Sequence, residues 1–266
     1  MATVREIVTL LDQAYPQWLA EDWDAVGLAC GRLEAEVDTA LLAIDPLPEI
    51  VDEAIASGAQ LIITHHPLFL HGVHGVAATT AKGEVITRCL ENGIALFSAH
   101  TNADHACPGV SDALAQAFGL GDLRPLVPDS RDAALGTGRV GTLPESMSLE
   151  SFGALVARSL PATAHGVRIA GDLGAQVRTV AVCGGAGDSF LGAAASAADV
   201  YVTSDLRHHR AQDHLVEGGC ALVDVAHWAS EWPWLRQAAS VIDGTVRTVV
   251  STTPTDPWAA HLGSTS

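Results

Sequence analysis

The sequence predicts an α/β protein of two similar domains whose sheets are mainly parallel. Short apolar runs at 39–45, 60–66 and 94–100 alternate with amphipathic segments of about ten residues, which is typical of βαβ units. The same alternation resumes after 148. Between 121 and 148 the pattern weakens and Gly, Pro, Asp and Ser become frequent, so this stretch is predicted to join the domains.

The individual elements follow from periodicity and from their end signals. The first helix has apolar residues at 4, 7, 8, 10 and 11 and stops at Pro16. Further helices are predicted at 49–59, 81–93, 110–120, 149–160, 187–198 and 209–219, with a tryptophan-rich helix after 227. Further strands are predicted at 177–185, 199–205, 220–227 and 245–252.

The bulk composition restricts the possible partners. The formal charge of −17 repels phosphate backbones and anionic lipids, so we expect neither nucleic-acid nor membrane binding. The five cysteines show no C-x-x-C spacing and do not suggest a disulfide framework. The N-terminal stretch lacks the uninterrupted apolar block that is typical of a signal peptide, and no apolar run reaches membrane-spanning length. These features predict a cytoplasmic protein.

Three predicted strands end in histidine and carboxylate side chains. In open parallel sheets, binding sites collect beyond the carboxyl ends of strands, so these side chains are expected to share a site. The residues are His65 and His66 near 60–66, His100 and Asp104 after 94–98, and His227 and Glu231 after 220–225.

The adjacent pair His65 and His66 has more than one explanation. Neighbouring residues on a strand point to opposite faces, so both can serve one site only if the chain leaves strand geometry, which Pro67 favours. Otherwise each faces a different ion, or the pair is simply a polar strand end.

The other two pairs also have simpler alternatives. The stretch 101–104 has good turn chemistry by itself. His227 and Glu231 have the spacing of an ordinary i,i+4 pair on a solvated helix. Because proline is comfortable only in a first turn, Pro233 predicts a helix that begins near Ser230, with His227 in the preceding loop.

Taken together, the three pairs favour a metal site. Imidazole with carboxylate suits Zn, Fe(II), Mn or Co, whereas Ca and Mg prefer oxygen ligands. Five ligands from among these six side chains would exceed one tetrahedral shell and fit two divalent ions, bridged by a carboxylate and completed by water.

Other clusters are weaker. His71 and His74 are predicted to be loop residues rather than ligands. The stretch 203–209, with Asp205, His208 and His209, is interpreted as a helix N-terminus. The glycine turn at 183–189 could hold an anion but lacks a P-loop lysine.

The motifs THHPLF, AHTNAD, TSDLRHH and AHWASE, in this order, resemble the GTP cyclohydrolase 1 type 2 homolog family, also called NGG-one-interacting-factor-three-like dinuclear metal-centre proteins. EDWDAVGLACG and VAVCGGAG resemble two further motifs of that family, so the similarity spans nearly the whole chain. Ala25, Ser204 and Ala226 depart from the family pattern without removing a ligand.

The resemblance implies a two-metal site and a particular domain arrangement. Its ligands would be His65, His66, Asp104, His227 and Glu231, and the C-terminal segment would return to the first domain. The domains would be 1–122 plus 226–266, which binds metal, and 123–225. The chain would form a homohexameric ring.

These expectations lead to one preferred function and two alternatives. The preferred function is a metal-dependent, cyclohydrolase-like hydrolase that applies a metal-bound hydroxide to a small anionic or nucleotide-like substrate. His100 would orient water or carry a proton. Asp104 is the better candidate for the bridging carboxylate, although Glu231 could take that place. The alternatives are a non-catalytic metal-binding or metal-handling protein and a ring-forming interaction protein.

Overall fold

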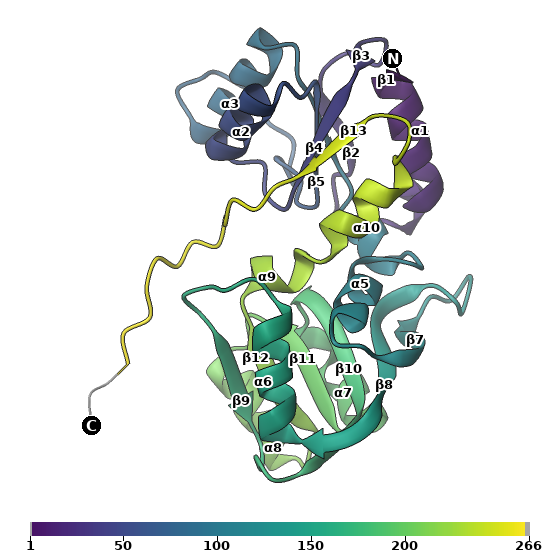
Figure 1. Cartoon of the computed structure of the whole chain (residues 1–266), viewed down its shortest axis with the longest axis vertical. Coiled ribbons are helices and arrows are strands. Elements are labelled where there is room, and N and C mark those ends of the chain that lie inside the picture. Colours follow the sequence, from purple (N-terminus) through teal and green to yellow (C-terminus); the bar gives the residue numbers. More distant parts are fainter. Residues whose placement is uncertain (1, 264–266) are drawn as a thin grey trace. The chain divides into compact units, whose positions relative to one another are not determined.

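The computed structural model describes residues 2–263 and divides into two compact units (Figure 1). Unit 1 extends to Ala106 and includes the later segment Leu235–Thr255. Unit 2 is Cys107–Trp234 together with the described residues from Asp256 onward. The predicted fold class is confirmed, including the return of a C-terminal segment to the first unit.

Unit 1 is built on a five-stranded sheet in the order β13-β4-β5-β6-β2. Neighbours are parallel except for β2, which pairs antiparallel with β6 at the edge. The three central strands β4, β5 and β6 are buried along their whole length, which explains their unbroken apolar sequences. The strands are β1 (Ala2–Thr3), β2 (Gly27–Cys30), β3 (Glu36–Val37), β4 (Thr39–Ala43), β5 (Leu61–Thr64), β6 (Ala95–Ser98) and β13 (Arg247–Val250).

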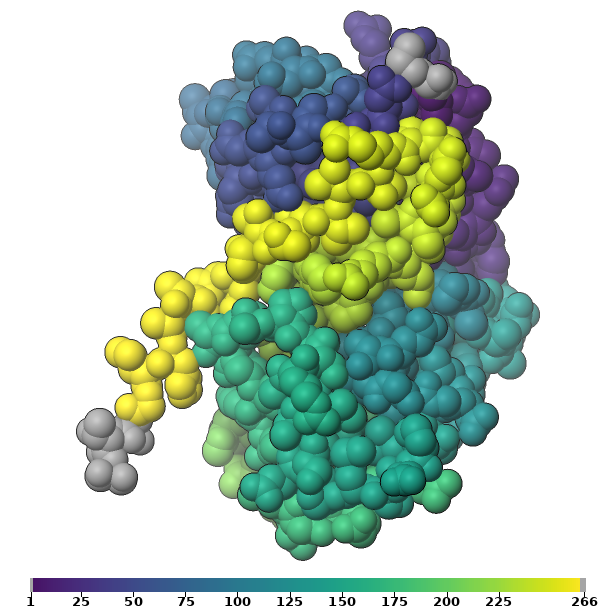
Figure 2. Space-filling view, in the orientation of Figure 1, coloured from purple at the N-terminus to yellow at the C-terminus, as the bar shows by residue number. Residues whose placement is uncertain are grey.

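Helices cover both faces of this sheet. Figure 1 shows α2 and α3 on one side and α1 and α10 on the other. Ile50 and Val85, from α2 and α3, pack on Ile62 of β5 within one buried cluster. Figure 2 shows the returning segment, in yellow, on the surface of unit 1. The helices are α1 (Val4–Ala14), η1 (Gln17–Leu19), α2 (Pro48–Ser57), α3 (Ala81–Glu91), α4 (Thr101–His105) and α10 (Trp234–Val241), the last beginning at the unit boundary.

Unit 2 is built on a six-stranded sheet in the order β7-β8-β10-β11-β12-β9. It is parallel in its centre, β10-β11-β12, and antiparallel at both sides. The strands are β7 (Gly121–Pro128), β8 (Gly136–Ser148), β9 (Val167–Ala170), β10 (Gln176–Ala186), β11 (Val200–Ser204) and β12 (Ala221–Val225).

The helices of unit 2 divide between two buried clusters. Phe152 of α6 and Leu114 of α5 belong to one cluster, and Leu191 of α7 with Leu215 of α8 belongs to the other. The helices are α5 (Val110–Ala117), α6 (Leu149–Ser159), η2 (Asp188–Phe190), α7 (Leu191–Ala197), α8 (His208–Val216) and α9 (His227–Glu231).

The prediction of a linker at 121–148 was wrong, because β7 and β8 form an antiparallel hairpin over this stretch. β7 contains Pro125 and Pro128, which the edge of a sheet tolerates because one side of the strand needs no donor. In β8, a Cβ on Gly136 would lie 2.2 Å from the Val127 carbonyl oxygen. The turn-forming residues therefore serve an edge strand and a close strand contact rather than a linker.

Among the described residues, no helix combines the length and apolarity that crossing a bilayer requires.

Candidate metal centre

The end of β5 delivers both adjacent histidines of unit 1 to one place. After Thr64 the backbone continues beside β4, with the amides of His65 and His66 bonded to Ala43 and Ile44 carbonyls at 3.2 and 2.9 Å. The Thr64 hydroxyl donates to the His66 carbonyl at 2.8 Å and so closes a tight turn. The two imidazole centroids are 5.1 Å apart. The chain therefore leaves strand geometry here.

His100, beyond the end of β6, joins this pair. Ring nitrogens of His65, His66 and His100 lie within 4.8 Å of one another, a spacing that could hold a metal ion. The His100 ring is 5.2 Å from that of His65 and 5.6 Å from that of His66. Although sequence reasoning gave His100 only a catalytic role, its nitrogen is as close to the pair as a ligand would be.

Each of these imidazoles is fixed through its Nδ1 atom. Nδ1 of His65 lies 2.9 Å from the Ala99 carbonyl oxygen, Nδ1 of His66 lies 2.7 Å from Asp45, and Nδ1 of His100 lies 2.9 Å from Asp24. These oxygens only accept, so each Nδ1 carries the proton. An oxygen at Nδ1 is typical of histidines that bind metal through Nε2.

Asp104 comes to the same group from α4. Its Oδ1 lies 3.7 Å from Nε2 of the fully buried His65. This distance is longer than a hydrogen bond and approaches the separation, about 3.4 Å, of two ligands on one tetrahedral ion. The buried Asn102 holds the loop, because its side-chain oxygen accepts from the His100 amide and its amide group donates to the Tyr15 carbonyl.

Asp24 fixes the His100 loop from the N-terminal part of unit 1. It accepts hydrogen bonds from the Thr101 amide at 3.0 Å and from the Thr101 hydroxyl. Burial alone would raise the pKa of Asp24, but the hydrogen bonds from His100 and Thr101 hold that pKa well below its usual range. The carboxylate is therefore charged and supports the His100 ring.

Unit 2 carries the second group of predicted ligands, on α9. The helix begins at His227 and ends at Glu231, so the prediction that it begins near Ser230 was wrong. Pro233 lies between α9 and α10, and each helix is short enough to avoid a proline in its interior. His227 Nε2 lies 3.0 Å from Glu231 Oε1, across one helical turn.

The His227 ring is held between two carboxylates. Its Nδ1 lies 2.7 Å from Asp205, at the end of β11. Glu231, followed by Asp205, raises the pKa of His227 to about 11 and outweighs burial, which would lower it. Asp205 adopts a left-handed conformation (φ 57°), which a non-glycine residue rarely takes without a reason such as this contact.

A glycine closes over the His227–Glu231 pair. Gly185, near the end of β10, has φ +67°, and a Cβ there would lie 2.4 Å from Glu231 Oε1 and 3.1 Å from His227 Nε2. Its amide donates to the Ser230 hydroxyl at 2.9 Å. The glycine turn that the sequence suggested as an anion cradle therefore packs directly on a candidate metal ligand.

The structure thus brings the predicted residues together within each unit. His65, His66, His100 and Asp104 form one group, and His227 and Glu231 form the other. His71 and His74 are exposed loop residues, and His208 and His209 begin α8. Sequence reasoning missed the roles of Asp24, Asp45 and Asp205. The acidic end of the 39–45 strand was the available signal for Asp45.

Fold and site define a two-unit α/β protein with histidine–carboxylate groups suited to metal. Comparison with known proteins identifies it further. The Duf34/NIF3 (NGG1p interacting factor 3) family matches residues 2–257, and the chain belongs to that family.

Relatives and solved structures agree with this assignment. The GTP cyclohydrolase 1 type 2 homolog of Streptomyces coelicolor is 48% identical, with 99% of this chain and 96% of that protein covered. The homolog of Mycobacterium tuberculosis is 36% identical over 95% of this chain and 96% of its own. The crystal structure of a Bacillus cereus protein related to NIF3 is 27% identical with a TM-score of 0.88, covering 97% of this chain and 98% of that one.

Proposed function

We propose that the chain is a metal-dependent hydrolase that holds two divalent ions and acts on a small anionic or nucleotide-like substrate. The proposed ligands are His65, His66, Asp104, His227 and Glu231. The observation that supports this proposal is the shared hydrogen-bonding pattern of the histidines. Each of the four imidazoles has an oxygen within 2.9 Å of its Nδ1 atom, which is the arrangement typical of histidines that bind metal through Nε2.

The donor set fits a borderline metal. Imidazole nitrogens with carboxylate oxygens suit Zn, Fe(II), Mn or Co better than Ca or Mg. When bound, such a pair of ions lowers the pKa of water and neutralises an anionic substrate group. Both effects assist hydrolysis near neutral pH.

The residues of the chain supply positioning and proton transfer. Asp45, Asp24 and Asp205 keep the rings of His66, His100 and His227 in place. His100 is proposed to exchange a proton at Nε2 with the reacting group, and its Asp24 partner would stabilise the protonated ring. Asp104 is the proposed bridging carboxylate.

A pocket beside His66 supports an anionic substrate. A cavity of about 200 Å³ in unit 1 is lined by His66, Asp45 and Lys82, with Leu68 and Val85 among its apolar residues. Lys82 is the only lysine in the sequence. An ammonium group that lines the same cavity as a proposed metal ligand favours a negatively charged substrate group. We expect Lys82→Met to raise KM while metal content stays unchanged.

The first experiment is metal analysis of the purified full chain, with about two ions per chain expected. His66→Ala should lose metal, whereas His74→Ala, in the exposed loop, should not. Full metal occupancy in the His66→Ala protein would contradict the proposed site.

The second experiment is a turnover screen of nucleotides, phosphodiesters and cyclic amides with Mn, Fe, Co and Zn. The name of the Streptomyces coelicolor relative places GTP among the nucleotides to test. Turnover that His100→Gln reduces without metal loss would support hydrolysis and the proton-transfer role. A metal-loaded protein that turns over none of these compounds would favour the metal-handling alternative.

The proposed assembly is a homohexameric ring, and the proposed partner is a small-molecule substrate. Light scattering on the metal-loaded chain measures the subunit number. A monomer at micromolar concentration would contradict the ring.

A further inference from the structure

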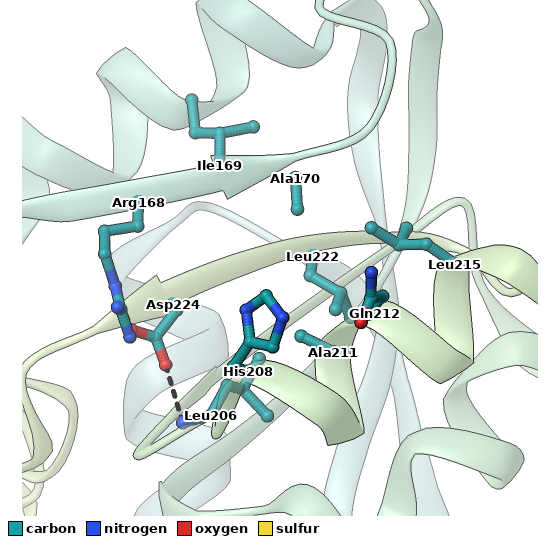
Figure 3. A pocket seen from close by; sticks show the side chains of 10 residues that line it. All are labelled: Arg168, Ile169, Ala170, Leu206, His208, Ala211, Gln212, Leu215, Leu222 and Asp224. Carbon is teal, nitrogen blue, oxygen red and sulfur yellow. Dashed lines mark hydrogen bonds and ion pairs between the residues drawn. The ribbon is translucent and has the colours of Figure 1, made fainter.

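A separate pocket of about 410 Å³ opens in unit 2, between the edge strand β9, the helix α8 and strand β12 (Figure 3). This volume lies in the range, about 300–1,000 Å³, that small-molecule sites occupy. Its apolar lining includes Ala170, Leu206, Leu215 and Leu222, and none of the proposed metal ligands lines it.

A buried carboxylate organises the polar side of this pocket. Asp224 is 5% exposed and accepts hydrogen bonds from His165 Nε2 at 2.8 Å, from Arg168 Nε at 2.9 Å and from the Leu206 amide at 3.0 Å. Figure 3 shows Asp224 between the Arg168 side chain and the Leu206 backbone. Because Arg168 is anchored along one edge of its guanidinium, the group has a fixed position at the pocket rim.

The rim keeps hydrogen-bonding capacity for a ligand. The Arg168 side chain is 60% exposed, and its Nη1 makes no hydrogen bond within residues 2–263. His208 stands in the middle of the pocket in Figure 3, and its ring nitrogens also lack a hydrogen bond within the described residues. The neighbouring Arg207 and Arg210 pair with Asp188 and do not line the pocket, so the groups that face a ligand at the rim are Arg168 and His208. The guanidinium of Arg168 and the ring of His208 suit a ligand with a negatively charged acceptor group.

We propose that this pocket binds a small molecule with a flat apolar body and one carboxylate or phosphate group, and that its occupation influences His227. The apolar body would lie against Leu206, Leu215 and Leu222. The negative group would lie between Arg168 and His208, where a bidentate contact to the guanidinium is available.

One turn connects the pocket to the metal-binding residues of unit 2. Leu206 lines the pocket and donates its amide to Asp224, and the preceding Asp205 holds His227 Nδ1 at 2.7 Å. A ligand that favours one position of this turn also favours one position of the His227 ring. This part of the proposal rests on the proposed metal centre. By thermodynamic linkage, metal binding must change the affinity of the pocket for its ligand by the same factor as the ligand changes the affinity for metal.

The binding test uses naphthoate and naphthyl phosphate as probes, with the neutral naphthamide as control, by calorimetry on the full chain. We expect both anions to bind at least about tenfold more tightly than the amide, the difference that one charge-assisted contact makes. His208→Gln should weaken the anions about tenfold, and its neighbour His209→Gln, which does not line the pocket, should leave them unchanged.

A steric variant guards against indirect effects. Ala211→Leu fills the pocket and should abolish binding, whereas Ala154→Leu, on the exposed side of α6, should not. Equal binding of all three probes, or unchanged binding to the Ala211→Leu protein, would overturn the proposed site.

The coupling test measures metal affinity with and without saturating naphthoate. A shift of about threefold or more in the unmodified chain, absent in Ala211→Leu, would support the coupling. An unchanged metal affinity with naphthoate bound would overturn it. If the chain binds no metal, the proposed function fails, but the probe titrations still show whether the pocket in unit 2 binds an anionic ligand.

Discussion

The His227 ring in unit 2 and the rings of His65, His66 and His100 in unit 1 differ in what their Nε2 atoms face. In unit 1, three rings bring nitrogens within 4.8 Å of one another, and the hydrogen-bonded carboxylates Asp24 and Asp45 lie behind two of them. In unit 2, one ring has carboxylates at both nitrogens, 2.7 and 3.0 Å away. Unit 1 thus presents a group of imidazole nitrogens to a cation, whereas His227, whose pKa is raised to about 11, must release a proton before its Nε2 can bind one.

The largest expected effect separates the two groups of ligands by metal content. His66→Ala should lower metal affinity by about 100-fold or more, because a lost ligand exceeds the effect of a lost supporting partner. Because His227 is also a proposed ligand, His227→Ala should lower the metal content as well. Elemental analysis and competition with a chelator measure both, with His74→Ala as the matched control. Loss of metal from His66→Ala alone would restrict the centre to unit 1.

The next effect concerns the carboxylates behind the unit 1 rings. Asp45→Asn should lower metal affinity about 10- to 100-fold, because the amide no longer supports the charge and proton position of His66. The comparable Asp52→Asn, which alters an exposed carboxylate bonded to Arg88, should leave it unchanged. Equal affinities for both variants would contradict the role assigned to Asp45.

The strand ends and the fold class were predictable because they depend on local pattern. The buried run 61–64 followed by two histidines needs no knowledge of its neighbours. The i,i+4 spacing of His227 and Glu231 was also visible in the sequence, but the start of α9 was misplaced, because Pro233 separates two helices rather than lying in the first turn of one. The supporting aspartates were not predictable, because each acts through a residue 21 to 76 positions away. The hairpin at 121–148 was missed because prolines suit an edge strand, and edge position is a property of the sheet.

A third prediction concerns the glycine over the unit 2 pair. Gly185→Ala should destabilise the protein by about 1–3 kcal/mol, because alanine is strained at φ +67° and its Cβ would approach Glu231 at 2.4 Å. Gly93 has the same φ, but nothing lies within 4 Å of its added Cβ. Gly93→Ala therefore measures strain alone, and denaturant unfolding of both variants gives the steric part by difference. Equal losses of stability in the two variants would show that the Glu231 side chain moves away from the added Cβ at no cost.

The smallest expected effect is a pH dependence that belongs to unit 2 alone. In the metal-free chain the pKa of His227 is raised to about 11 from an ordinary 6.5 by Glu231 and Asp205. A raised folded-state pKa contributes stability in full below 6.5, and this stability is lost as the pH rises towards 11. The stability difference between the unmodified chain and His227→Gln should therefore shrink from pH 7 to 10.

The size of this pH effect is limited because the His227 side chain is 33% exposed. We therefore expect the stability difference to change by about 1 kcal/mol after solvent screening. Denaturant titrations of chelator-treated protein at several pH values measure it, and His74→Gln provides the control. Metal affinity should move in the opposite direction and rise with pH, because each ion that binds His227 displaces its proton. A metal affinity independent of pH between 7 and 9 would mean that His227 is not a ligand, and the difference between the two units would then mark unit 1 as the only metal-binding half.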